Sequence, residues 1–104
     1  MNNFLIVLLG PTGVGKSDVA VEIASHFGIE IISSDSRQFY REMTIGTAVP
    51  EPALLARVKH HFIQFISVRD YYSSSLYERD VLALLPSLFS RGGAALMTGG
   101  SGLY

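Results

Sequence analysis

The segment Gly10-Pro11-Thr12-Gly13-Val14-Gly15-Lys16-Ser17 constrains this chain most, because it has the G-x-x-x-x-G-K-[ST] spacing of a phosphate-binding loop. Glycines at both ends let the backbone curl, so that successive N–H groups form a nest for phosphate oxygens. Lys16 can place its ammonium group against a terminal phosphate, and Ser17 can offer a hydroxyl to Mg²⁺. The sequence therefore predicts a bound nucleotide or diphosphate, with Mg²⁺ as the cofactor.

The flanks of this loop have the strand-then-helix order that the motif requires. The apolar run from Phe4 to Leu9 has the length of a parallel strand that is buried on both faces. After the loop, apolar residues recur at helical spacing as far as Phe27, and Gly28 can end this helix in the left-handed conformation. This context disfavours the alternative of a glycine-rich turn that binds nothing.

The rest of the chain alternates predicted strands and helices. We expect strands at residues 29–32, 62–66 and 94–98, and helices at residues 53–59 and from Ser75 to Phe89. Ser75 and Glu78 have the spacing of a capping box, Gly92-Gly93 would stop the second helix, and Pro86 would kink or split it. This order predicts an α/β fold with a doubly wound parallel sheet, like that of the P-loop nucleoside-triphosphate hydrolases.

The composition agrees with an α/β core that meets something else. The chain has 104 residues, of which 48% are hydrophobic and 16% charged, which is apolar for so small a domain. We expect residues 1–104 to form one phosphate-binding core, truncated at its C-terminal side relative to a longer protein and inactive in isolation. A net charge of −1 with scattered basic residues gives no electrostatic footprint for nucleic acid.

The start of the chain has no basic segment of the kind found in signal peptides, and its apolar run is too short to span a membrane. We therefore expect a cytoplasmic protein with no membrane partner. The absence of cysteine excludes disulfides and thiolate metal sites.

Asp35 is the second candidate functional residue. It follows the second predicted strand, at the edge where ligands bind in doubly wound sheets. Its carboxylate could bind Mg²⁺ through water, or take a proton from a nucleophile that attacks beside the bound phosphates. A loop aspartate that caps a short helix over residues 37–40 is the alternative, and the position of Asp35 favours the functional interpretation.

Five blocks of the sequence resemble, in their order and spacing, the tRNA dimethylallyltransferase (isopentenyltransferase) family. They are Gly10 to Ser17, Asp35-Ser36-Arg37-Gln38-Phe39-Tyr40, Met43 with Ile45-Gly46-Thr47-Ala48 and Pro50, His60-His61, and Gly99-Gly100-Ser101-Gly102-Leu103-Tyr104. The resemblance implies a prenyltransferase of tRNA modification. Such an enzyme moves the dimethylallyl group of dimethylallyl diphosphate to N6 of the adenosine on the 3′ side of the anticodon in tRNA.

The resemblance also implies roles for single residues. The phosphate loop would hold the diphosphate leaving group, with Lys16 stabilising the departing charge and Ser17 and Thr12 positioning Mg²⁺ and phosphate oxygens. Asp35 matches the general base that takes the N6 proton. Ser101 stands where the family usually has Thr, near the reacting end of the prenyl donor. The residues that would face the tRNA are Asp35, Ser36, Arg37, Gln38 and Ser101, and the complete enzyme would act as a monomer.

Some positions depart from the family pattern. Thr44 and Val49 stand where Asp and Lys usually flank the Ile-Gly-Thr-Ala block, and Phe62 and Gln64 replace Leu and Asp after the paired histidines. A phosphate contact made by that lysine therefore has no counterpart here.

Two pairs of neighbouring residues are interpreted as mainly structural. His60 and His61 fit structural or tRNA-backbone contacts better than metal binding, because adjacent residues at the start of a strand point to opposite faces. Tyr71 and Tyr72 are predicted to pack locally.

Three function classes remain open from the residues, namely a prenyltransferase, a nucleoside or nucleotide kinase, and a regulatory nucleotide switch or assembly ATPase. A nucleoside or nucleotide kinase would use the same loop to bind ATP and Asp35 as the base toward a hydroxyl. A regulatory nucleotide switch or assembly ATPase is disfavoured, because no hydrophobic strand ends in a second acidic Mg²⁺ ligand. Within the transferase family, a free adenine nucleotide could replace tRNA as the acceptor, and the donor chain length also stays open.

Overall fold

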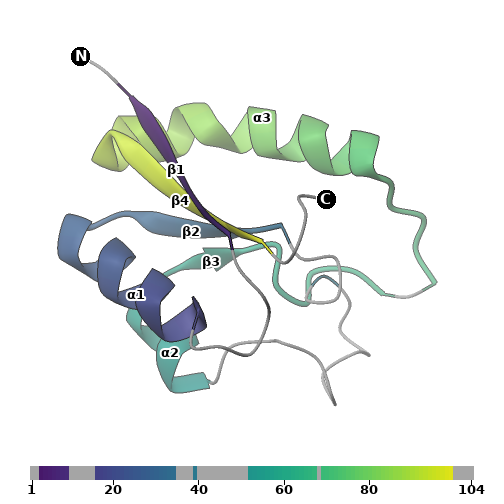
Figure 1. The fold of residues 1–104 in the computed structure, drawn as a ribbon. Helices are drawn as coiled ribbons and strands as arrows, with labels where there is room; N and C mark the ends of the chain where they lie inside the picture. Colours follow the sequence, from purple (N-terminus) through teal and green to yellow (C-terminus); the bar gives the residue numbers. More distant parts are fainter. Residues whose placement is uncertain (1–2, 10–15, 35–38, 40–51, 68, 100–104) are drawn as a thin grey trace.

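The fold is a four-stranded parallel sheet with helices, and the computed structural model describes residues 3–9, 16–34, 39, 52–67 and 69–99. Along the chain, the elements are β1 (Phe4–Leu9), α1 (Lys16–Phe27), β2 (Glu30–Ser33), α2 (Pro52–Arg57), β3 (His60–His61), α3 (Ser74–Gly92) and β4 (Ala94–Gly99). The strand order is β1-β4-β2-β3, and each neighbouring pair is parallel (Figure 1). The predicted parallel α/β sheet is therefore confirmed.

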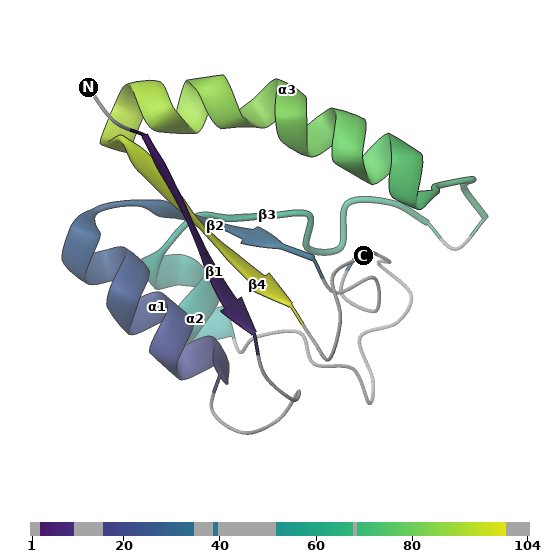
Figure 2. The same cartoon turned by 45° about the horizontal axis from the view of Figure 1, so that its top comes forward.

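Helices cover both faces of the sheet, with α1 and α2 on one face and α3 on the other (Figure 2). Successive strand residues divide between the two layers because side chains alternate along a strand. Ile31 packs in the core beneath α1, whereas Ile32 packs in the core beneath α3. Leu96 and Met97 of β4 divide in the same way. This three-layer arrangement is the doubly wound form predicted from the sequence.

Strand β1 lies at one edge of the described sheet, where β4 is its neighbour. Phe4, Leu5 and Val7 are 59%, 41% and 43% exposed. The prediction that this strand is buried on both faces is therefore wrong for these residues. Its position at the edge is the reason, since β4 is its neighbour in the described sheet and α3 packs mainly on β4.

Helix α1 ends as the sequence predicts. Gly28 has a φ of +66°, the left-handed conformation that glycine adopts without strain. The next residue, Ile29, donates its backbone N–H to the carbonyl of Ala24 at 3.0 Å. Because this N–H completes the end of the helix, β2 begins at Glu30, one residue later than predicted.

The third strand is the clearest error of the sequence prediction. Strand β3 comprises His60–His61, and the predicted segment 62–66 is irregular. Phe62 and Gln64 have φ values of 68° and 50°, which a strand does not tolerate. The apolar residues of this segment instead join an aromatic cluster, in which the rings of Phe62 and Phe65 pack against Phe39. Helix α2 ends at Arg57, and the carbonyl of Lys59 already accepts the N–H of Ile31 at 2.9 Å.

The start of α3 differs from the predicted capping box. Ser73 is the N-cap, and its hydroxyl accepts the backbone N–H of Leu76 at 3.3 Å. Ser75 is therefore already inside the helix, and the predicted cap with Glu78 is wrong by two residues. At the other end, Gly93 adopts a left-handed φ of 74° and donates its N–H to the carbonyl of Phe89 at 2.8 Å.

Helix α3 continues through Pro86 and is not split there. A proline lacks the N–H that would bond the carbonyl four residues earlier, which here belongs to Leu82. Both residues are exposed, so water can satisfy that carbonyl. Among the described helices, α3 included, none has the length and apolar character needed to cross a membrane.

Candidate functional site

The carboxyl ends of β1, β4 and β2 lie side by side in one row of the sheet. Leu8 of β1 is in register with Thr98 of β4, and Thr98 is in register with Ser33 of β2. Two residues beyond this row, the chain reaches Gly10, Gly100 and Asp35, respectively. The three segments that carry the predicted site residues therefore begin at the same edge of the sheet, where doubly wound folds bind their ligands.

Helix α1 begins at Lys16, close to the carboxyl end of β1 (Figure 2). The first N–H groups of a helix have no partner within the helix and carry a partial positive charge. Such a helix start attracts anions, and the predicted phosphate loop connects β1 to it. The backbone on both sides of the loop therefore has the arrangement that the motif requires.

Hydrogen bonds tie the end of β2 to β4. Ser34 donates its backbone N–H to the carbonyl oxygen of Thr98 at 2.8 Å, and its hydroxyl donates to the same oxygen at 2.7 Å. Ser33 and Ser34 are each 1% exposed, so solvent does not compete for these bonds. The two chain segments that lead to Asp35 and to Gly100 are thus joined where they leave the sheet.

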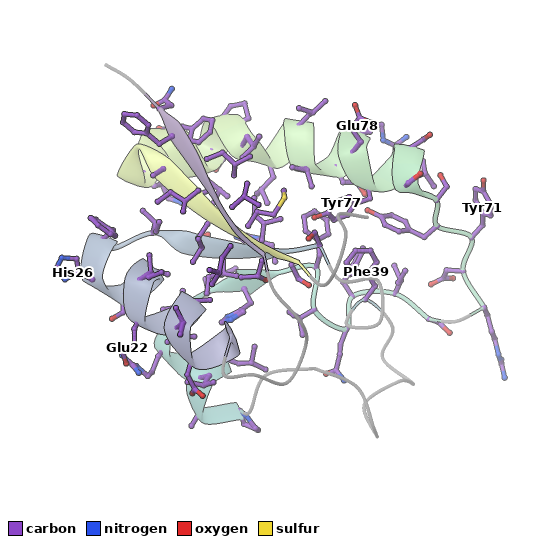
Figure 3. All side chains as sticks on the ribbon, in the orientation of Figure 1. Glu22, His26, Phe39, Tyr71, Tyr77 and Glu78 are labelled. Carbon is purple, nitrogen blue, oxygen red and sulfur yellow. The ribbon has the colours of Figure 1, made fainter. Side chains whose placement is uncertain are left out.

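A tyrosine of α3 contacts the same point. The hydroxyl of Tyr77 donates to the carbonyl oxygen of Ser33 at 2.8 Å. Figure 3 shows this side chain between α3 and the sheet, close to Phe39. Burial raises the pKa of Tyr77 well above its usual value of 10, although a hydrogen bond with the Ser34 side chain acts in the opposite direction. The phenol therefore keeps its proton at any physiological pH and remains a donor.

Phe39 holds the other end of the Asp35 segment. Its ring is completely buried, and it packs against Phe65, Tyr72 and Tyr77 at centroid distances of 5.4, 5.9 and 5.3 Å. Its carbonyl oxygen accepts the N–H groups of Phe65 and Ile66. The two described residues that flank positions 35–38 in the sequence, Ser34 and Phe39, are therefore each held by buried contacts.

Most of the predicted site residues lie outside the described part of the chain. These are Gly10 to Gly15, Asp35 to Gln38, and Ser101. Lys16 and Ser17 lie in the first turn of α1 as backbone, and their side chains are outside the description. The roles assigned to these residues stay predictions. The structure shows the ends of β1, β2 and β4 and the start of α1, which adjoin these residues in the sequence.

Sequence reasoning missed the residues that organise this edge, namely Ser34, Tyr77 and Thr98. The pair Ser33-Ser34 at the end of an apolar strand, directly before Asp35, was a usable signal, because buried hydroxyls need partners. Tyr77 was visible only as an inner residue of the assumed capping box. Its contact with Ser33 spans 44 residues of sequence, so no local pattern could indicate it.

A polar cluster lies at the amino end of β2, beside β3. Glu30 accepts a hydrogen bond from His61 Nε2 at 2.6 Å and from Arg91 Nη2 at 3.1 Å. Burial alone would raise the pKa of Glu30, but the hydrogen bonds and charges of His61 and Arg91 outweigh it and leave this pKa lowered.

The neighbouring histidine has a backbone partner. His60 donates from Nδ1 to the carbonyl of Val58 at 2.8 Å, and burial lowers its pKa. Each histidine ring thus has a partner within the protein, which agrees with the structural alternative of the prediction and leaves tRNA-backbone contacts untested. Among the described residues, no group of three or more acidic or histidine side chains is placed to hold a metal ion.

The predicted packing of the two neighbouring tyrosines is only half right. The hydroxyl of Tyr72 donates to Asp80 at 2.7 Å, and its ring packs in the aromatic cluster. Tyr71 is 84% exposed and lies away from the core (Figure 3).

An apolar hollow of about 450 Å³ lies between α3 and the sheet, beside the joined strand ends. Its lining includes Leu5 and Met97 from the sheet, Val81 and Leu85 from α3, and Ser34. The hollow is distinct from the start of α1, which lies on the other face of the sheet. It lacks described cationic side chains, so it does not suit a phosphate group.

The comparison with protein families finds one match, to the model described as IPP transferase, over residues 38–104. Curated relatives support the same family. A tRNA dimethylallyltransferase of Christiangramia forsetii is 52% identical over 104 residues, which are 100% of this chain and 34% of the relative. A tRNA dimethylallyltransferase 2 of Porphyromonas gingivalis is 55% identical over 100 residues, 96% of this chain and 33% of the relative. The chain thus spans about a third of the length of the curated relatives that it matches.

Solved structures resemble the fold closely. The tRNA delta(2)-isopentenylpyrophosphate transferase of Staphylococcus epidermidis superposes with a TM-score of 0.87 at 32% identity, covering 95% of this chain and 33% of that one. The full-length tRNA isopentenylpyrophosphate transferase of Bacillus halodurans gives a TM-score of 0.87 at 33% identity, covering 100% of this chain and 34% of that one. These likenesses support the P-loop-like α/β fold expected from the sequence.

Proposed function

Because this chain belongs to the IPP transferase family, we propose that it forms the donor-binding and catalytic core of a tRNA dimethylallyltransferase. The reaction transfers the dimethylallyl group of dimethylallyl diphosphate to N6 of the adenosine next to the anticodon, on its 3′ side. Relatives at about half sequence identity bear the name of this activity. The donor and the acceptor position come from the family resemblance of the sequence blocks.

The observation that carries the proposal is the register of Leu8, Thr98 and Ser33. A transferase of this kind must bring a leaving group, an acceptor amine and a base within bonding distance of one another. The phosphate loop, the Asp35 segment and the segment with Ser101 follow these three residues in the sequence, so all three begin at a single edge of the sheet. This common starting edge supports assigning the leaving-group site, the base and the donor-side hydroxyl to one active site.

The phosphate loop, Gly10 to Ser17, would bind the diphosphate of the donor. Lys16 would neutralise the charge that grows on the diphosphate as the allylic C–O bond breaks. Mg²⁺ fits this site, because it is usually held by few protein oxygens together with phosphate oxygens and water. The hydroxyl of Ser17, a residue in the first turn of α1, would be such a ligand, with Thr12 as a second candidate. When bound, Mg²⁺ would supply further charge neutralisation.

Asp35 would act as the general base. In the proposed reaction, N6 of the adenine forms a bond to C1 of the dimethylallyl group while the C–O bond to diphosphate breaks, and Asp35 takes the proton that N6 loses. The adenine must leave its stack to reach this site. Ser36, Arg37 and Gln38, together with Ser101, would contact the tRNA around the extruded base.

The proposal includes a monomeric, cytoplasmic enzyme. All of the segments assigned to the site come from one chain, so no second copy is needed to complete it. A tRNA substrate fits the cytoplasmic location expected from the sequence.

The test is a single-turnover transfer assay with the complete natural polypeptide that carries these residues, an anticodon stem-loop and dimethylallyl diphosphate. We expect Asp35→Asn to lower the transfer rate by about 10²- to 10⁴-fold, the usual contribution of a general base, and to leave donor affinity unchanged. The matched control is Asp70→Asn, because Asp70 is an exposed aspartate bonded to the backbone of Ser67. The control variant should transfer at the wild-type rate.

Three outcomes would contradict the proposal. Transfer by Asp35→Asn within a few-fold of wild type would make Asp35 a structural residue. Prenylation of free adenine nucleotides without prenylation of the stem-loop would replace tRNA as the acceptor. Phosphoryl transfer from ATP, without any prenyl transfer, would assign the chain to the kinases.

A further inference from the structure

The ends of β2 and β4 are joined by more hydrogen bonds than strand pairing alone supplies. Ser34 lies one residue beyond β2, and it still donates both its N–H and its hydroxyl to Thr98, at 2.8 and 2.7 Å. Tyr77 of α3 donates its hydroxyl to Ser33, the last residue of β2, at 2.8 Å. We call these contacts among Ser33, Ser34, Tyr77 and Thr98 the strand-end clasp.

The clasp holds its geometry because it is buried and because its donor groups, the N–H and hydroxyl of Ser34 and the hydroxyl of Tyr77, keep their protons. Ser33 and Ser34 are 1% exposed and Tyr77 is 4% exposed, so water does not replace the bonds. A serine hydroxyl does not titrate, and burial keeps the phenol of Tyr77 neutral. The clasp therefore restrains the backbone in the same way across the physiological pH range.

The clasp lies one residue before Asp35 along one segment and two residues before Gly100 along the other. We propose that Ser34 and Tyr77 are positioning residues for the transfer reaction, which fix the Asp35 segment against the segment that carries Ser101. This inference rests on the proposed function, because it assigns the base and the hydroxyl near the donor to these two segments. Neither residue is a catalytic residue, since they act through the backbone that they hold.

The connectivity predicts which kinetic constant depends on the clasp. The phosphate loop follows β1, which is attached to the sheet by its own ladder with β4. Loosening the clasp should therefore leave the diphosphate site in place and misplace the base relative to it. A misplacement of about 1 Å can reduce turnover by about 10²-fold without loss of binding. We expect a lower kcat with an unchanged KM for the donor.

Four variants of the complete natural polypeptide test this inference. Tyr77→Phe and Ser34→Ala each remove one clasp hydroxyl, and Ser34→Thr keeps the hydroxyl and adds a methyl group beside the apolar hollow, which Ser34 lines. Tyr72→Phe is the matched control. It removes a tyrosine hydroxyl bonded at 2.7 Å from the same aromatic cluster, but that hydroxyl contacts Asp80 on α3 and not a strand end.

The assay measures kcat and the donor KM for each variant under steady-state conditions. We expect Tyr77→Phe and Ser34→Ala to lower kcat by about tenfold or more, with the donor KM within about twofold of wild type. Ser34→Thr and Tyr72→Phe should keep the wild-type kcat. Equal losses of kcat in Tyr77→Phe and Tyr72→Phe, or a wild-type kcat in Ser34→Ala, would overturn the positioning role.

Hydrogen exchange separates failure of this inference from failure of the proposed function. Backbone amides of residues 33–39 and 97–101 should exchange faster in Ser34→Ala than in Tyr72→Phe. Unchanged exchange would show that the clasp restrains nothing, whatever the enzyme does. Faster exchange in a protein whose wild type transfers no prenyl group would confirm the clasp as a structural device, and it would overturn both the proposed function and the positioning role in transfer.

Discussion

The N-cap of α3 gives the sharpest stability test, because the sequence and the structure assign it to different serines. The structure places the cap at Ser73, whose hydroxyl accepts the N–H of Leu76 at 3.3 Å. Loss of a serine cap costs about 0.5–2 kcal/mol. The bond is long for its type, so the cost of Ser73→Ala should be about 1 kcal/mol. For a domain of this size, that corresponds to a fall in Tm of roughly 4–8 °C.

Ser75→Ala is the matched control, because it makes the same chemical change two residues later. Ser75 is exposed and already inside the helix, where alanine is the better helix former by up to about 0.5 kcal/mol. The two variants should therefore shift stability in opposite directions.

Urea unfolding of the 104-residue chain, followed by circular dichroism at a concentration where sedimentation shows a monomer, measures both changes. A loss in Ser75→Ala that equals or exceeds the loss in Ser73→Ala would refute the cap at Ser73. It would restore the capping box that the sequence suggested. An unchanged m-value in both variants is required for the comparison, since it shows that the unfolded state is the same.

Lys16→Ala should weaken the binding of Mg²⁺-pyrophosphate at least tenfold, about 1.4 kcal/mol, and calorimetry with equal affinities would contradict the diphosphate role. The 104-residue chain should self-associate through the exposed apolar side of β1, and Val7→Lys should reduce this association in sedimentation experiments across concentration. Glu30 should contribute to acid stability, because its pKa in the folded state is lowered from 4.5 by its contacts with His61 and Arg91. Its contribution is present above the unfolded pKa and is lost as pH falls through the folded one, so Glu30→Gln should flatten that part of the pH profile.

Local features of the sequence predicted the elements whose ends depend on neighbouring residues. The strand from Phe4 to Leu9 was predicted with its observed bounds. Gly28 and Gly93 end their helices in the left-handed conformation because only a residue without Cβ adopts it freely. The phosphate-loop spacing and the strand-to-helix order around it likewise depend on contacts between residues close in sequence, which a pattern can record.

The prediction of a strand at residues 62–66 failed because distant residues decided the outcome. The segment looks like a strand by composition, but its aromatic rings pack around Phe39, and the backbone at Phe62 and Gln64 has left-handed φ values. Tertiary packing outweighed a local preference of about 1 kcal/mol or less there. The error at the start of α3 was of another kind, because the observed cap is a local bond between Ser73 and Leu76, three residues apart, and the sequence prediction chose the wrong serine.

The sequence by itself determined the α/β fold and the membership of the IPP transferase family, and it predicted a phosphate-binding loop, since the motif, its flanks and the ordered blocks can all be read along the chain. Only the tertiary structure decided the strand order, which inserts β4 between β1 and β2. That order brings Ser34 against Thr98, 64 residues away, and leaves β1 at an edge. Strand order depends on which apolar faces pack together in three dimensions, and no periodicity along the chain contains that information.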